Sequence, residues 1–204
     1  MSDVLGTAGY GTNAAALAQQ YESLQFTDVH RDVLHCFPPP PARVLDIGAG
    51  SGRDAAALAA LGHRVMAVEP THALRMEGMR RHAAWPIEWV DDHLPALQRI
   101  RASGGRHDLV LLTAVWMHLD TGERDVAMAA VVELLAECGQ VVMSLRHGPV
   151  PPGRRMFDVS AQETVRLAEA HGLALRFLCE REDMLDRGDV TWSFLVLQAR
   201  AAPV

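Results

Sequence analysis

Short apolar runs alternate with longer segments of helical periodicity along most of the chain. The apolar runs are rich in valine, leucine and isoleucine, which favours buried strands. The predicted strands cover residues 43–47, 63–68, 87–90, 109–113, 140–145, 173–179 and 192–199. The predicted helices cover residues 53–61, 71–82, 94–102, 121–137 and 161–171. Parallel strands need helix-sized connections, so the alternation predicts an α/β protein with a doubly wound, mostly parallel sheet and helices on both faces.

The two ends of the chain depart from this alternation. Residues 13–36 contain few helix breakers and predict one or two helices, which the prolines at positions 38–41 end. Residues 180–190 are charged, turn-rich and too few for a helical crossover, so we expect an antiparallel return between the last two strands. No internal repeat or linker interrupts the chain, and we expect one domain over residues 1–204.

Composition narrows the classes of partner. The formal net charge is -6 and all 19 basic residues are arginine, so no basic field favours nucleic acid. Cys36, Cys138 and Cys179 lack disulfide or ligand spacing, which predicts no metal site and a reducing compartment. The chain shows no signal-peptide pattern and no run of about 18 apolar residues. We therefore expect a soluble, cytoplasmic protein with no membrane partner and an oligomeric state that the sequence does not indicate.

The most specific motif follows the first predicted strand. Residues 44–52 read Val-Leu-Asp-Ile-Gly-Ala-Gly-Ser-Gly, so Asp46 is followed by Gly48, Gly50 and Gly52 at alternate positions. Glycines allow the turn to bring its backbone close to a ligand. The dinucleotide fingerprint has the different spacing G-x-G-x-x-G, which argues against a nicotinamide or flavin dinucleotide.

With Asp46 before the glycines, this motif resembles the first signature of the class I S-adenosylmethionine (SAM) dependent methyltransferases. The resemblance covers nearly the whole chain from about residue 43 to residue 200. It implies a Rossmann-like sheet of seven strands with an antiparallel last strand. It also implies SAM as methyl donor, S-adenosylhomocysteine (SAH) as its product, and a helical lid over residues 1–42 before a core over residues 43–204.

Ligands of open α/β sheets lie beyond the carboxyl ends of the strands, where this chain has a coherent set of polar residues. A carboxylate at Glu69 suits a ribose diol, and Arg53 at a helix start suits the methionine carboxylate. The resemblance implies that Asp91, which we favour, or Asp92 lies toward the adenine amino group, although a solvated turn also explains the pair. Asp54 is equally explained as an acid at a helix start. The predicted cofactor residues are Tyr21, Asp46, Gly48, Ala49, Gly50, Gly52, Arg53, Asp54, Glu69, Pro70, Asp91, Asp92 and Thr113.

Methyl transfer from a sulfonium chiefly requires a nucleophile held in line, and a base only when the nucleophile is a hydroxyl or an ammonium group. His118 is the candidate base, with a purely structural role at the strand end as the alternative. Arginines bind carboxylates and phosphates bidentately, so Arg146 and Arg155 indicate an anionic substrate, unless acidic neighbours pair with them. The predicted substrate residues are Tyr10, Trp116, Met117, Arg146 and Arg155.

These features predict a SAM-dependent methyltransferase for a small-molecule acceptor. A protein or tRNA methyltransferase is the nearest alternative, and the chain lacks the lysine-rich run that would favour it. A noncatalytic SAM-binding protein is a second alternative. A nicotinamide-dependent reductase is a third, which the glycine spacing disfavours.

Overall fold

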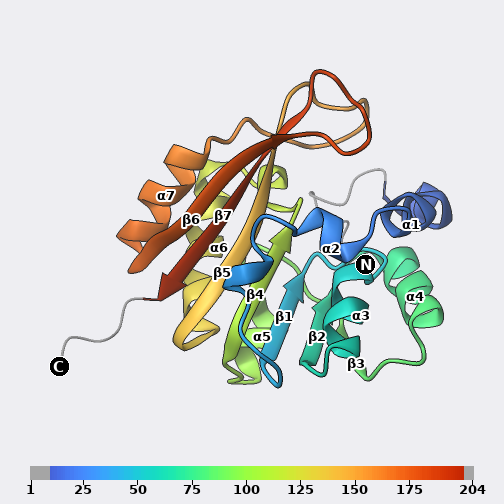
Figure 1. Ribbon diagram of the computed structural model, residues 1–204, viewed down its shortest axis with the longest axis horizontal. Coiled ribbons are helices and arrows are strands. Elements are labelled where there is room, and N and C mark those ends of the chain that lie inside the picture. The colour runs from blue at the N-terminus through green and yellow to red at the C-terminus, as the bar shows by residue number, and fades with distance from the viewer. Residues whose placement is uncertain (1–9, 200–204) are drawn as a thin grey trace.

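The computed structural model describes residues 10–199, which form a seven-stranded sheet covered by helices (Figure 1). The strand order is β3-β2-β1-β4-β5-β7-β6. Strands β1 to β5 run parallel, and β7 is antiparallel to both β5 and β6. The predicted fold class, including the antiparallel return, is confirmed. The strands are β1 (Arg43–Ile47), β2 (Arg64–Val68), β3 (Ile87–Val90), β4 (His107–Thr113), β5 (Leu135–His147), β6 (Leu173–Glu182) and β7 (Thr191–Ala199).

The helices lie before and between the strands. The α-helices are α1 (Ala14–Glu22), α2 (Phe26–Val29), α3 (Arg53–Ala60), α4 (His72–Arg81), α5 (Gln98–Ala102), α6 (Thr121–Glu133) and α7 (Ala161–Ala170). Short 3-10 turns are η2 (Gly11–Asn13), η3 (Leu34–Cys36) and η4 (Trp116–His118). Among the residues that the structure describes, no helix has both the length and the apolar character needed to cross a lipid bilayer.

Two hydrophobic cores cover the two faces of the sheet, because successive strand side chains point to opposite sides. On β4, Val110 and Leu112 join one core with residues of α5, α6 and α7. Their neighbours Leu109 and Leu111 join the other core with residues of α3 and of the segment before β1. The continuous apolar run that predicted a buried strand therefore serves both cores.

Two predicted helix boundaries are wrong. The helix predicted over residues 94–102 begins only at Gln98, because the carboxylate of Asp92 accepts hydrogen bonds from the amides of Arg99 and Ile100 and so fixes the helix start there. The helix predicted over residues 121–137 ends at Glu133, because Leu135 already pairs with His107 in the sheet. In both places a contact distant in sequence overrides local helical propensity.

Candidate active site

A cavity of about 720 Å³ opens at the carboxyl ends of the parallel strands. Its floor is the loop between β1 and α3 together with the ends of β2 and β4. The segment before β1 contributes Tyr10, Leu17 and Tyr21, and the connection from β6 to β7 contributes Met184 and Leu185. Such a volume falls within the range of roughly 300–1,000 Å³ that is usual for small-molecule sites.

The three glycines after β1 have positive φ angles of 71°, 58° and 87°, but they do different things. Gly50 faces the cavity, and its amide donates to the Glu69 carboxylate at 2.9 Å. A Cβ on Gly52 would lie 2.6 Å from the Trp89 ring, and Gly52 does not line the cavity. Gly52 thus permits close packing of α3 against β3, and the structure corrects its predicted place among the cofactor residues.

Asp46, Asp54 and Glu69 are three buried carboxyl groups around the glycine loop. Burial, reinforced by the charge of Asp54, raises the pKa of Asp46 well above its usual range, and Oδ2 of Asp46 has no hydrogen-bond partner. Burial also raises the pKa of Glu69, although the amides of Gly50 and Thr71 donate to its carboxylate. The floor of the cavity therefore holds acceptor oxygens that the protein satisfies only in part.

The carboxylate of Asp54 is saturated by protein groups. It accepts hydrogen bonds from His30 Nε2 at 2.8 Å, from Thr113 Oγ1 at 2.9 Å and from Arg53 Nε at 2.7 Å. Burial alone would raise the pKa of Asp54, but the charges of His30 and Arg53 outweigh it and hold that pKa well below its usual range. Asp54 therefore joins the segment before β1 to the start of α3.

The structure separates the two acids after β3. Asp92 is buried and lines the cavity, although its carboxylate also caps α5. Asp91 pairs with Arg75 at 2.9 Å and does not line the cavity. Of the two, only Asp92 lines the cavity, and the contact of either acid with adenine stays a prediction.

His118 presents one basic nitrogen to the cavity. Its Nδ1 lies 2.8 Å from the carbonyl oxygen of Arg155, and since a carbonyl only accepts, Nδ1 carries the proton. Its Nε2 accepts a hydrogen bond from the Tyr10 hydroxyl at 3.0 Å. Burial, together with the charges of Arg154 and Arg155, lowers the pKa of His118 below its usual value of 6.5. The imidazole is neutral near pH 7 and its tautomer is fixed.

Arg146 and Arg155, predicted as an equivalent pair, have different environments. The Arg155 guanidinium donates to Glu123 at 2.8 Å and to Asp120 at 3.2 Å, the two residues of the capping box of α6. It also donates to the carbonyl of His118 at 2.7 Å, which completes a reciprocal pair of bonds between these residues. Arg155 thus fixes the position of His118 through these two hydrogen bonds. Arg146 forms no ion pair with a carboxylate among residues 10–199.

Most predicted site residues line the one cavity. They are Tyr10, Tyr21, Asp46, Gly48, Ala49, Gly50, Arg53, Asp54, Glu69, Pro70, Asp92, Thr113, Met117, His118, Arg146 and Arg155. Trp116 does not: its side chain is fully buried in the core, which corrects the prediction that it faces the substrate.

Cavity residues from the last two strands escaped the sequence reasoning. Trp192 and Phe194 on β7 line the cavity, and both carry aromatic rings. Because β7 is antiparallel to β5, its first residues meet the carboxyl end of β5, with Trp192 opposite Arg146. The antiparallel return predicted from the sequence already implied that the first residues of the last strand lie at this edge of the sheet.

Comparison with known proteins agrees with this site. A family model described as a methyltransferase domain matches residues 44–139, which run from β1 through the glycine loop and His118. Residues 44–139 therefore form a methyltransferase domain. Neighbours of the same fold were solved with SAM or SAH bound, and the glycine loop and buried carboxyl groups of this chain fit such a methyl donor. No curated protein sequence matches the chain significantly.

Solved structures of other methyltransferases share the fold. A TehB-like SAM-dependent methyltransferase from Corynebacterium glutamicum has a TM-score of 0.70 at 20% identity, covering 93% of this chain and 99% of its own. The 1,6-didemethyltoxoflavin-N1-methyltransferase of Burkholderia thailandensis, solved with 1,6-didemethyltoxoflavin and SAH, has a TM-score of 0.67 at 21% identity, covering 92% and 89%. The N-methyltransferase NodS of Bradyrhizobium japonicum has a TM-score of 0.65 at 15% identity, covering 90% and 97%.

Proposed function

We propose that this methyltransferase acts on a small-molecule acceptor bound beside His118, under a lid formed by the segment before β1. The observation that carries the proposal is the neutral His118 Nε2 inside a cavity of small-molecule size. SAM supplies an electrophilic methyl group on a sulfonium and leaves as SAH, with the bonding electron pair retained on sulfur.

The floor of the cavity supplies the groups that would hold the donor. Glu69 offers a carboxylate to a ribose diol and lies beside the glycine loop, where the Gly50 amide donates to it. Arg53 lines the same floor and provides positive charge for a carboxylate. Asp92 offers a carboxylate to an amino group at the far end, beyond β3.

His118 would act as the general base for a hydroxyl or ammonium acceptor. The Nε2 lone pair, which now accepts a hydrogen bond from Tyr10, takes the acceptor's proton as the nucleophile attacks. The hydrogen bond from Nδ1–H to the Arg155 carbonyl oxygen stabilises the imidazolium that forms. A thiolate or neutral amine acceptor would need no such step. His118 would then only orient the acceptor.

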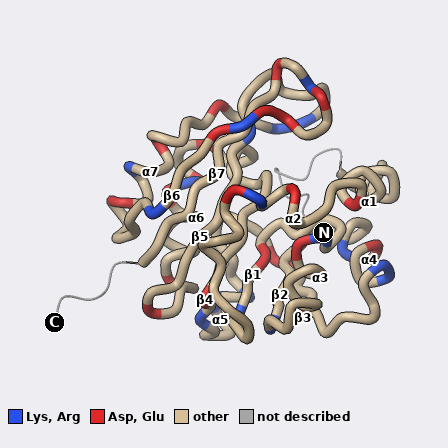
Figure 2. The backbone as a smooth tube through the Cα atoms, in the orientation of Figure 1, with Lys and Arg blue, Asp and Glu red and all other residues tan. Residues whose placement is uncertain are grey.

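The shape and charge of the molecule favour a small acceptor over a macromolecule. Tyr10 and Tyr21 from the segment before β1 line the cavity and leave limited room beside the donor. Figure 2 shows Arg interspersed with Asp and Glu along the backbone, and the formal net charge of -6 does not favour binding to a nucleic acid backbone. The toxoflavin enzyme of similar fold was itself crystallised with a small-molecule acceptor.

Two measurements test this function. Calorimetry should show SAH binding that Glu69→Gln weakens about tenfold, whereas Glu88→Gln, the same change at an exposed position on β3, leaves it unchanged. Transfer of labelled methyl from SAM should then be detected with a panel of small hydroxyl, amine and thiol compounds, and it should require the folded lid. Methylation of tRNA or protein in preference to every small compound would refute the proposal, as would SAH binding without any transfer.

A further inference from the structure

The guanidinium of Arg146 lines the cavity and forms no ion pair with a carboxylate of the described residues. Within residues 10–199, its guanidinium donates to the carbonyl oxygens of Pro149 at 2.9 Å and Gly148 at 3.3 Å and pairs with no carboxylate. Its Nε is buried and has no hydrogen-bond partner. Burial, and then the charge of Arg187, lower the pKa of Arg146, and the charges of Asp183 and Asp189 offset this only in part. An anion bound at the cavity side of the guanidinium would supply a charge to match it.

Other arginines at the cavity have their carboxylates already. Arg187 donates to both oxygens of Asp183 at 2.9 Å and 2.6 Å. Arg155 is held by Glu123 and Asp120. The contrast distinguishes Arg146 from Arg155 and Arg187, and it favours Arg146 over Arg155 as the side chain that binds an anionic ligand.

The phenol of Tyr10 shows what kind of group fits beside His118. Its hydroxyl lies 3.0 Å from His118 Nε2, and the guanidinium of Arg154 stacks 3.6 Å from the centre of its ring. The charge of Arg146 also acts on this hydroxyl, counteracting the burial that raises the pKa of Tyr10. An aromatic ring with a hydroxyl thus already occupies the place where base and cations converge.

We propose that the acceptor is a small hydroxylated aromatic acid. Its carboxylate pairs with Arg146, its ring lies against Trp192 and Phe194, and its hydroxyl meets His118 Nε2 where the Tyr10 hydroxyl now lies. This inference rests on the proposed function, because it names the acceptor of that same site. The acceptor hydroxyl and the Tyr10 hydroxyl would bind the same nitrogen, His118 Nε2, so Tyr10 has to move away as the acceptor enters.

Calorimetry on the protein saturated with SAH tests the inference directly. The probes are 2-, 3- and 4-hydroxybenzoate and the three corresponding hydroxybenzamides, which have nearly the same shape and hydroxyl but no charge. At least one acid should bind tenfold tighter than its amide. Arg146→Gln should reduce that preference to less than twofold while SAH affinity stays unchanged, and Tyr10→Ala should tighten acid binding at least threefold.

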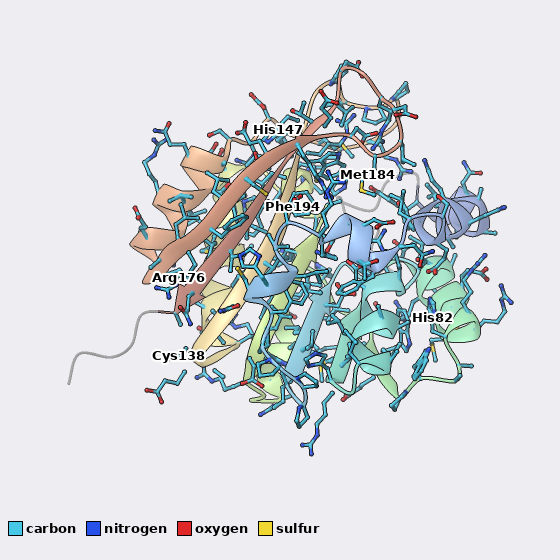
Figure 3. The ribbon with its side chains drawn as sticks, in the orientation of Figure 1. His82, Cys138, His147, Arg176, Met184 and Phe194 are labelled. Carbon is cyan, nitrogen blue, oxygen red and sulfur yellow. The ribbon has the colours of Figure 1, made fainter. Side chains whose placement is uncertain are left out.

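Arg176→Gln is the matched control, since it removes the same charge from an exposed position on β6 that does not line the cavity. Figure 3 shows Arg176 well away from Met184 and Phe194, both of which line it. This variant should keep the full preference for the acid. If Arg146→Gln fails to fold, as judged by circular dichroism, Arg146→Lys carries the test, because it keeps the charge, loses the fork and should lose at least threefold of the preference.

The outcomes separate this inference from the function beneath it. SAH binding without a preference of any acid over its amide overturns the aromatic acid alone. A preference that survives in Arg146→Gln overturns the role of Arg146. Failure of the wild-type protein to bind SAH at all would instead refute the proposed function.

Discussion

A buried contact between His30 and Asp54 joins the segment before β1 to the start of α3. His30 Nε2 and Asp54 Oδ2 are 2.8 Å apart, and their side chains are 2% and 5% exposed. Replacing one partner of a buried pair leaves an uncompensated charge, which costs about 3–5 kcal/mol. Asp54 keeps its bonds from Arg53 and Thr113, so we expect His30→Leu to lower the free energy of unfolding by about 3 kcal/mol.

The chain provides a matched surface pair for comparison. His171 Nε2 and Asp125 Oδ1 are 2.9 Å apart, almost the same distance, but their side chains are 24% and 65% exposed. Exposed pairs contribute about 0–1 kcal/mol, so His171→Leu should cost less than about 1 kcal/mol. The contrast isolates burial as the cause, because side-chain types and distance are nearly constant.

Urea unfolding of wild type, His30→Leu, Asp54→Leu and the double variant, followed by circular dichroism at pH 7, measures these costs. The double variant should lose less stability than the two single losses together, since both single changes remove the same His30–Asp54 contact. Equal costs for His30→Leu and His171→Leu, or additive losses in the cycle, would refute the reasoning.

Three further predictions follow from single sites. Burial, aided by the charge of Arg43, lowers the pKa of His107 to about 4. As the pH falls, His107 is therefore protonated in the unfolded chain before it is protonated in the folded protein. The free energy of unfolding should fall by roughly 2 kcal/mol between pH 6.5 and 4. His107→Leu should flatten that part of a urea-unfolding pH series, and an unchanged slope would contradict it. Gly52→Ala should cost about 2–3 kcal/mol in the same assay, because its Cβ meets Trp89 at a φ of 87°, whereas Gly104→Ala, at a φ of 69° with nothing within 4 Å, should cost only about 1 kcal/mol. If His118 is the base, the acid limb of kcat/KM for a hydroxyl acceptor should lie below pH 6.5 and disappear in His118→Gln, and a limb at higher pH would speak against it.

The parts of the fold that were predictable are those specified locally. The run before Gly48 has the apolar character of a strand, and the glycines after it have the positive φ angles that make a turn. The ends of α5 and α6 were not predictable in this way, because they depend on Asp92 reaching the amides of Arg99 and Ile100, and on Leu135 meeting β4. Periodicity reports the face of an element, and it carries no information about a distant partner that ends the element.

The same distinction holds for the site. Strand ends identified the acids and His118, since parallel strands bring their carboxyl ends to one edge. The unequal roles of Arg146 and Arg155 depended on which carboxylates lie near, although one clue was legible: Asp120 and Glu123 have the spacing of a capping box just before an apolar helix. A capping box at the carboxyl edge of the sheet places two carboxylates within reach of an arginine from a neighbouring loop.

The lid and the donor loop are joined by contacts that make their order interdependent. Ser51 donates to Glu22 at 2.6 Å, Arg53 donates to the carbonyl of Tyr21 at 3.3 Å, and Asp54 accepts from His30. These three residues of the donor loop and the start of α3 stand next to the glycines that border the donor's place. A ligand that orders this loop should therefore also order the segment before β1. By thermodynamic reciprocity, ordering of that segment should strengthen ligand binding at the loop. Tyr10 belongs to the same segment, and its hydroxyl lies 3.0 Å from His118 Nε2, so these contacts also connect the loop after β1 with the surroundings of His118.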